Sequence, residues 1–222
     1  MCVIIASMTD VHASDYIWFR EEFPGLVESY CLTLVEGVSA EGLLRRLGAV
    51  QGRPVTGVDD ALLAFDEFDD RADGADPALA ELDEDLVAVG VTELDGWAVV
   101  VEQYGNLGIT REVMAALSEG TRLVAHYRNI NAVDHFYWQE GGRTRLHFEP
   151  LFAAHRDGPD AADPEVATLL AACGFDLRES DDRDYRLHIP AAFALGERLT
   201  GVRLTAEVLR TATFVIGYAP QP

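Results

Sequence analysis

Strand-like patterns of hydrophobic and polar residues dominate the middle of the chain. Between Leu86 and Glu149, the runs LVAVGVTEL and WAVVVEQ flank Asp95-Gly96, and HFYWQE and RTRLHFE flank Gly141-Gly142. Such short β-branched and aromatic runs predict strands, and Asp-Gly or Gly-Gly accepts the positive φ angles of a tight turn. We therefore predict two hairpins here. TRLVAHY and the earlier YCLTLVEG predict two further strands.

Apolar residues three or four positions apart predict helices around these strands. Ser39, Thr110 and Thr205 are expected N-caps, because a side-chain oxygen can accept a free backbone N–H. The expected helices cover YIWFREEF, the segments from Ser39 to Gly48, from Thr110 to Gly120 and from Asp163-Pro164 to Gly174, the segment opened by Pro190, and AEVLRTATFVIGY. DALLAFDEF fits either a helix or a strand, and YRLHI fits a short edge strand.

These elements predict an α+β fold, with a mostly antiparallel sheet and helices packed on one of its faces. A chain of 222 residues fits one domain. We expect residues 1–15 to be a loosely ordered extension and residues 16–222 to form the domain. Residues 190–219 could alternatively be a C-terminal appendage.

The charge balance limits the partners that the chain can bind. There are 38 acidic and 17 basic residues, the formal net charge is −21, and lysine is absent. Nucleic acid and anionic membranes would be repelled, whereas a basic protein or a cationic ligand would be attracted. Solubility alone also explains such a charge. Asp59 to Asp85 is the most acidic stretch, and we expect a solvated loop there, since its spacing does not match a calcium-binding loop.

The sequence lacks the residues that several classes of enzyme chemistry require. The three cysteines, Cys2, Cys31 and Cys173, form no CxxC pair, and the last two lie in apolar stretches, so we expect them to be buried. Without lysine the chain has no Schiff-base residue, no anchor for pyridoxal phosphate and no Walker-type phosphate ligand. No GxSxG elbow or dinucleotide-binding glycine loop is present. We expect no cofactor, leave enzymatic activity open, and place the protein in the cytoplasm.

Three histidines and a glutamate are candidate metal ligands. His147 and Glu149 alternate on one strand and leave it on the same face, and His126 and His135 flank the RNINAVD connector, so these four side chains could converge. However, none of the usual metal-ligand spacings occurs, and histidines on strands are mostly structural. We therefore predict no metal site.

One polar constellation remains as a candidate binding site. Glu102 ends a strand, Trp97 lies in the same strand, and Arg128, Asn129 and Asn131 follow a neighbouring strand. An arginine and two asparagines can hold a carboxylate or amide by forked hydrogen bonds. The alternative, purely structural interpretation is that the asparagines fix the loop backbone while Arg128 pairs with Glu102. His126 and His135 complete the candidate set.

Four segments of the chain carry a resemblance. YCLTLVEGVSAEGLLRRLGA, GWAVVVEQYGNLG, LSEGTRLVAHYRNINAVDHFYW and FEPLF resemble an actinobacterial family of small acidic proteins, which is a domain of unknown function. Its members usually have Pro-Asn where this chain has Gln103-Tyr104, and Val where it has Ile130. The resemblance runs from about Tyr16 to about Phe175 and implies no activity.

Two functions from different classes follow from these residues. The leading one is a non-enzymatic acidic binding protein, immunity-like, antitoxin-like or regulatory, acting on a basic protein. The alternative is a small-molecule enzyme or ligand-binding protein of a biosynthetic pathway, with a pocket around Glu102, His126, Arg128 and Asn131. A purely scaffolding role cannot be separated from the first by sequence.

Overall fold

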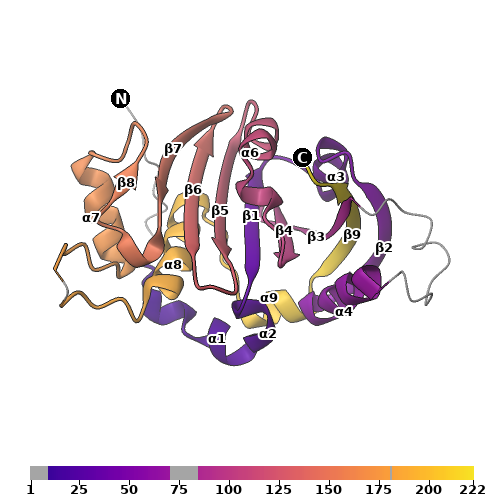
Figure 1. Cartoon of the computed structure of the whole chain (residues 1–222), viewed down its shortest axis with the longest axis horizontal. Helices are drawn as coiled ribbons and strands as arrows, with labels where there is room; N and C mark the ends of the chain where they lie inside the picture. Colours follow the sequence, from indigo (N-terminus) through magenta and orange to yellow (C-terminus); the bar gives the residue numbers. More distant parts are fainter. Residues whose placement is uncertain (1–9, 71–84, 181) are drawn as a thin grey trace.

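A computed structural model describes residues 10–70, 85–180 and 182–222, and it has an α+β fold built on one antiparallel sheet (Figure 1). Its nine strands are β1 (Tyr30–Glu36), β2 (Val50–Thr56), β3 (Leu86–Leu94), β4 (Trp97–Gln103), β5 (Arg122–Arg128), β6 (Asp134–Glu140), β7 (Arg143–Phe148), β8 (Arg156–Asp157) and β9 (Thr213–Pro220). Their order across the sheet is β2-β9-β3-β4-β1-β5-β6-β7-β8. The predicted fold class is confirmed.

The helices cover both faces of this sheet, so the expectation of helices on one face only is wrong. They are η1 (Ala13–Tyr16), α1 (Trp18–Glu22), α2 (Pro24–Val27), α3 (Ala40–Arg46), α4 (Gly57–Asp69), η3 (Leu107–Ile109), α6 (Arg111–Leu117), η4 (Pro150–Phe152), α7 (Pro164–Cys173), α8 (His188–Thr200) and α9 (Ala206–Thr211). We call the face covered by η1, α1, α4 and α8 the inner face and that covered by α3 and α6 the outer face. A separate buried hydrophobic cluster lies under each set.

Both predicted hairpins are present. Asp95 and Gly96 join β3 to β4 with φ angles of 50° and 81°, and Gly141 and Gly142 join β6 to β7 with φ angles of 56° and 77°. These left-handed conformations are the reason that the turns need Asp-Gly and Gly-Gly. The two hairpins are not neighbours, because β1 lies between β4 and β5.

Two of the three expected N-cap side chains, Ser39 and Thr205, make their cap hydrogen bonds. The expectation for Thr110 is wrong, because its hydroxyl donates to the Asn106 carbonyl and caps no N–H of α6. The Ser39 side chain accepts the N–H of Gly42, the Asp163 side chain accepts that of Glu165, and Gly174 ends α7 with a φ of 107°. Cys31 and Cys173 are buried, as expected.

The end of the chain differs from the prediction. The helix expected through AEVLRTATFVIGY stops at Thr211, and Thr213–Pro220 forms β9 between β2 and β3. β-Branched and aromatic residues here fit a pleated sheet better than a helix, and Phe214 and Ile216 point into the inner core. Residues 190–219, considered above as a C-terminal appendage, thus contribute a strand to the interior of the sheet.

The structure decides the conformation of three other segments. DALLAFDEF is helical, as part of α4, so the acidic loop expected from Asp59 is helix as far as Asp69, and residues 71–84 lie outside the described residues. The edge strand expected at YRLHI is wrong, because His188 already begins α8. β2 was not predicted, since Gly52 and Pro54 interrupt its pattern.

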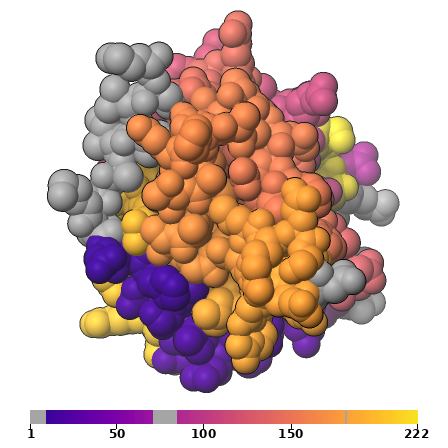
Figure 2. All heavy atoms as spheres, turned by 90° about the vertical axis from the view of Figure 1, so that its left-hand side faces the viewer, coloured from indigo at the N-terminus to yellow at the C-terminus, as the bar shows by residue number. Residues whose placement is uncertain are grey.

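The described residues that precede α1 pack against the rest of the domain. Residues 1–9 of the expected extension lie outside the described residues, whereas Val11 and Ala13 are buried. Further along the chain, α7 and its flanking segments cover the β8 end of the molecule (Figure 2). None of the described helices is long and apolar enough to cross a membrane.

Candidate functional site

The predicted site residues are divided between the two faces of the sheet. Residues opposite each other in the strand register point to the same face, and neighbours along a strand point to opposite faces. His126 lies in an inner row with Leu32 and Phe136. Tyr127 lies in an outer row, across β1 from Glu102. Glu102 and His126 therefore do not share a pocket.

Glu102 is held under the 3₁₀ turn η3 on the outer face. Its side-chain oxygens accept the backbone N–H groups of Leu107 at 2.8 Å and Gly108 at 2.9 Å, and the carboxyl group also hydrogen-bonds the Cys31 side chain. Burial raises the pKa of Glu102 to about 7, although these hydrogen bonds act in the opposite direction. Only Gly fits at position 108, because a Cβ there would lie 1.9 Å from Thr33 Oγ1. Glu102 thus anchors η3 to the sheet.

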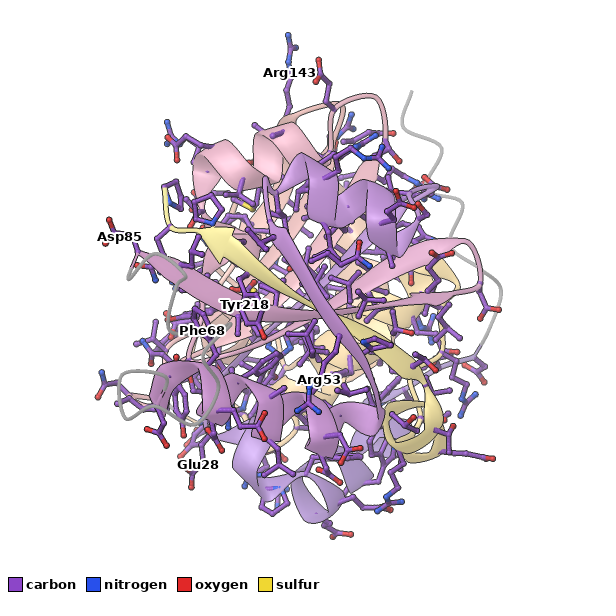
Figure 3. The ribbon with its side chains drawn as sticks, turned by 90° about the vertical axis from the view of Figure 1, so that its right-hand side faces the viewer. Glu28, Arg53, Phe68, Asp85, Arg143 and Tyr218 are labelled. Carbon is purple, nitrogen blue, oxygen red and sulfur yellow. The ribbon has the colours of Figure 1, made fainter. Side chains whose placement is uncertain are left out.

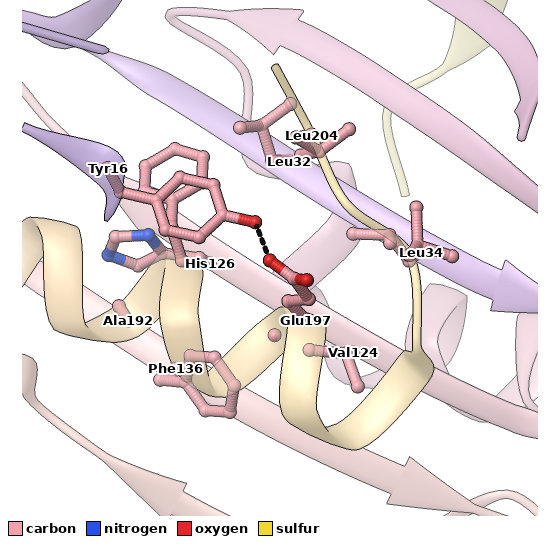
Figure 4. Close-up of a pocket in the computed structure, with 12 residues that line it drawn as sticks. Tyr16, Leu32, Leu34, Val124, His126, Phe136, Ala192, Glu197 and Leu204 are labelled. Carbon is pink, nitrogen blue, oxygen red and sulfur yellow. Dashed lines mark hydrogen bonds between the residues drawn. The ribbon is translucent and has the colours of Figure 1, made fainter. Parts of the chain in front are cut away.

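His126 lines a small cavity between the inner face and α8 (Figure 4). Its Nδ1 lies 3.1 Å from the Tyr30 hydroxyl, and its Nε2 has no hydrogen-bond partner among the described residues. Burial lowers the pKa of His126 to about 4, so the imidazole is neutral at physiological pH.

The polar side of this cavity is a buried phenol–carboxylate pair. The Tyr16 hydroxyl donates to Glu197 Oε2 at 2.7 Å, and burial raises the pKa of Tyr16. Apart from these two residues and His126, the lining has no polar side chain, and the cavity volume of about 20 Å³ is the size of a single water site.

Arg128 pairs with Asp134 instead of Glu102, which corrects the expected ion pair. The two residues face each other across β5 and β6, and Arg128 Nη1 lies 2.8 Å from Asp134 Oδ2. His188 Nε2, in the first turn of α8, lies 3.1 Å from the same oxygen. Burial by itself would raise the pKa of Asp134, but the His188 hydrogen bond and the Arg128 charge hold it below its ordinary value. This network locks α8 onto the sheet.

The two asparagines and Trp97 lie away from that network. Asn129 Oδ1 accepts the N–H groups of Asn131 and Val133 at 3.0 Å each. Asn129 therefore fixes the loop backbone, as the structural interpretation predicted. Asn131 itself is exposed. Trp97 begins β4 and lies about 17 Å from Glu102 along the strand, on the inner face, under the Arg122 guanidinium.

His135 belongs to a group of half-buried rings on the outer face. His147 Nε2 lies 3.3 Å from His135 Nδ1, and His147 Nδ1 lies 3.7 Å from Asp157 Oδ2. Tyr127 stacks on His135, and Tyr137 stacks on His147 at a centroid distance of 4.2 Å. His126 lies on the other face, so the four-ligand convergence considered from the sequence does not occur. Across the described ranges, no three His, Cys, Asp or Glu side chains converge to hold a metal ion.

An acidic surface with an apolar centre lies on α4, which Figure 3 shows beside β2 and β9. Leu63 is 60% exposed, while its helix neighbours Phe65 and Phe68 are buried. The residues three and four positions on either side of Leu63 share its helix face and are all exposed carboxylates. We call these five residues the α4 surface: Asp59, Asp60, Leu63, Asp66 and Glu67. Glu67 also pairs with Arg53 of β2 at 2.8 Å.

Sequence reasoning missed the α4 surface, although its signal was present. A leucine flanked at both i±3 and i±4 by acidic residues is visible in DDALLAFDE once a helix is assumed, but DALLAFDEF left helix and strand open. The contact between Asp134 and His188 was also missed, and for this contact no local signal exists, because 54 residues separate the two.

The fold and these surfaces define an α+β protein with closed polar networks inside and an acidic helix face outside. The chain belongs to the family of unknown function DUF6461, which matches residues 9–222. No curated protein matches the chain, and no solved structure matches it.

Proposed function

We propose that this chain is a non-enzymatic binding protein, immunity-like, antitoxin-like or regulatory, that holds a basic protein partner through the α4 surface. The observation that carries the proposal is the 60% exposed Leu63 at the centre of four carboxylates on one helix face. A single exposed leucine is common on protein surfaces, so the support comes from the combination of an apolar centre with four surrounding carboxylates on one helix face.

The two kinds of group would contribute differently to binding. An apolar residue at the centre of an interface fills a pocket on the partner and contributes much of the affinity. The surrounding carboxylates would select a basic partner, and the net charge of −21 would accelerate its approach. Glu67 already pairs with Arg53, so a partner arginine would compete with an arginine of the chain itself at that position.

The proposal also covers the excluded partners, the cellular compartment and the origin of the protein. The acidic charge disfavours nucleic acid and anionic membranes as partners. The absence of a CxxC pair or disulfide framework in the sequence favours the cytoplasm. The actinobacterial origin that the sequence resemblance implies is part of the same proposal.

The small-molecule alternative has less support from the geometry. It required Glu102, His126, Arg128 and Asn131 to line one pocket, but Glu102 and His126 point to opposite faces, and Arg128 is engaged by Asp134. The cavity at His126 has room for about one water molecule. A ligand of metabolite size would have to push α8 away from the sheet.

The test compares two exposed apolar residues. Wild-type protein, Leu63→Ser and Ile130→Ser are immobilised, and each captures protein from a lysate of the producing cells at low and high salt. Ile130 is 70% exposed in the RNINAVD connector, so its replacement is a matched control. Captured proteins are identified by mass spectrometry, and the main one is purified for calorimetric titration.

We expect a basic protein that binds wild type and Ile130→Ser alike, weakens with salt, and loses about tenfold or more in affinity with Leu63→Ser. Asp59→Asn and Asp60→Asn should mainly slow association. Equal binding by Leu63→Ser and wild type would refute the proposal. Binding of any unrelated basic protein with the same affinity would refute it too, because that outcome reflects charge alone.

A further inference from the structure

We propose that His135 and His147 form a two-histidine site for a divalent transition-metal ion, with Zn²⁺ as the test ion. The two residues lie on adjacent strands, β6 and β7, on the part of the outer face where the rings are only half buried. The site is separate from the α4 surface and does not depend on the proposed function.

The distance between the two facing nitrogen atoms is the main observation. His147 Nε2 and His135 Nδ1 are 3.3 Å apart. Zn–N bonds of about 2.0–2.1 Å at a tetrahedral angle of about 109° place two ligand nitrogens about 3.3–3.4 Å apart. The imidazoles are therefore already at the separation of two ligands of one tetrahedral ion. The same separation lets one ring donate an N–H···N hydrogen bond to the other, and a bound ion would replace that single hydrogen bond with two coordination bonds.

The nitrogen on the far side of His147 faces a carboxylate. Asp157 Oδ2 lies 3.7 Å from His147 Nδ1, and Asp157 pairs with His147 in the register of β7 and β8. In metal sites, a carboxylate beside the non-ligating imidazole N–H orients the ring and makes the ligating nitrogen more basic. Asp157 would therefore keep the proton on Nδ1 and leave Nε2 free to bind the ion.

Both rings are held in place from the side. Tyr127 stacks against His135 with ring centroids 6.2 Å apart, and Tyr137 stacks against His147 at 4.2 Å. Such packing lowers the entropy lost when the ligands are fixed. The negative charges of Asp157 and Glu149, which interacts electrostatically with His135, favour a cation at this place.

The site supplies two protein ligands, so water or a group on a partner would fill the other positions. It is therefore a smaller site than the three-ligand groups, which are absent among the described residues. Imidazole nitrogen suits Zn²⁺, Cu²⁺ and Ni²⁺, whereas Ca²⁺ and Mg²⁺ prefer oxygen. This preference separates the histidine pair from nonspecific binding to the acidic surface.

The experiment is a calorimetric titration of the full chain with Zn²⁺ and, separately, with Ca²⁺. Wild type, His135→Gln, His147→Gln and His155→Gln are compared, and circular dichroism checks that each is folded. His155 is exposed and lies outside the pair, so it is the matched control. Lowering the pH should weaken Zn²⁺ binding, because a protonated imidazole cannot coordinate.

We expect one Zn²⁺ site in wild type and His155→Gln, and its loss in both His135→Gln and His147→Gln. Asp157→Asn should retain the site with about tenfold lower affinity. Retention of Zn²⁺ binding in His135→Gln or His147→Gln would overturn the proposal. A Zn²⁺ isotherm indistinguishable from that of Ca²⁺ would overturn it as well, since acidic side chains alone would then explain the binding.

Discussion

Polar residues are enclosed on the inner face of the sheet around β5 and half buried on its outer face. On the inner face, Arg128 and His126 are enclosed, the former by Asp134 and the latter by Tyr30. On the outer face, the neighbouring strands present His135 and His147 at a half-buried surface. The difference follows from α8, which covers the inner face, whereas His135 and His147 on the outer face are only half buried.

The comparison teaches that burial alone does not mark a functional site. Asp134 is fully buried and charged, yet its partners from β5 and α8 explain it as a clamp between helix and sheet. The less buried His135 and His147 contact each other, and His147 also faces Asp157, on the outer face where their rings are only half buried. Three predictions test this contrast, beginning with the largest expected effect.

Replacing Asp134 with Ala should destabilise the protein by about 3–5 kcal/mol, because Arg128 and His188 would lose their shared buried partner. Urea unfolding measures this loss. The control is Glu41→Ala, which breaks an exposed ion pair with Arg45 and should cost less than about 0.5 kcal/mol. Similar losses in the two variants would show that the inner network is not a clamp.

Two of the buried titratable groups, Glu102 and His126, should give opposite dependences of stability on pH. The folded protein holds the Glu102 proton more tightly than the unfolded chain does, because the pKa is raised from 4.5 to about 7. Its contribution to stability is therefore complete below about pH 4.5 and is lost as the pH rises towards about 7. His126 has its pKa lowered from 6.5 to about 4, so its contribution is lost as the pH falls through that window. Each contribution is at most roughly 3 kcal/mol.

Urea unfolding of wild type, Glu102→Gln and His126→Gln at about pH 5 and about pH 8 tests this prediction. Relative to wild type, Glu102→Gln should gain stability between the lower and the higher pH, because the opposing loss from Glu102 is removed. His126→Gln should change in the reverse direction. Parallel pH profiles of all three proteins would contradict the assigned burial of these groups.

The smallest effect concerns the outer face. Gly108→Ala should destabilise the protein by about 1–3 kcal/mol, since the added Cβ would clash with Thr33 and Cys31 beneath η3. Gly25→Ala is the control, because a Cβ at Gly25 in α2 meets nothing within 4 Å. That variant should be neutral or more stable by up to about 1 kcal/mol. Thermal unfolding of both variants measures the difference, and a stable Gly108→Ala variant would mean that η3 is free to move.

Part of the candidate site was predictable because its interactions are local. The role of Asn129 follows from its place in a short loop, where its side chain can reach the N–H groups of Asn131 and Val133. The partner of Arg128 was not predictable from the candidate binding residues, which included Glu102 and not Asp134. Asp134 is only six positions away, but the choice between it and Glu102 depends on which strand lies beside β5.

The sequence by itself determined the elements whose cause is local. Asp95-Gly96 and Gly141-Gly142 specify the hairpins through backbone conformation, and Ser39 and Asp163 specify helix starts through side-chain hydrogen bonds.

Only the tertiary structure decided the order of the strands. It placed β1 between β4 and β5, and β9 between β2 and β3. The register then brought His135 beside His147 and put Glu102 and His126 on opposite faces. The physical reason is that a strand pattern fixes which side chains share a face, whereas the neighbouring strand is chosen by the packing of the whole core.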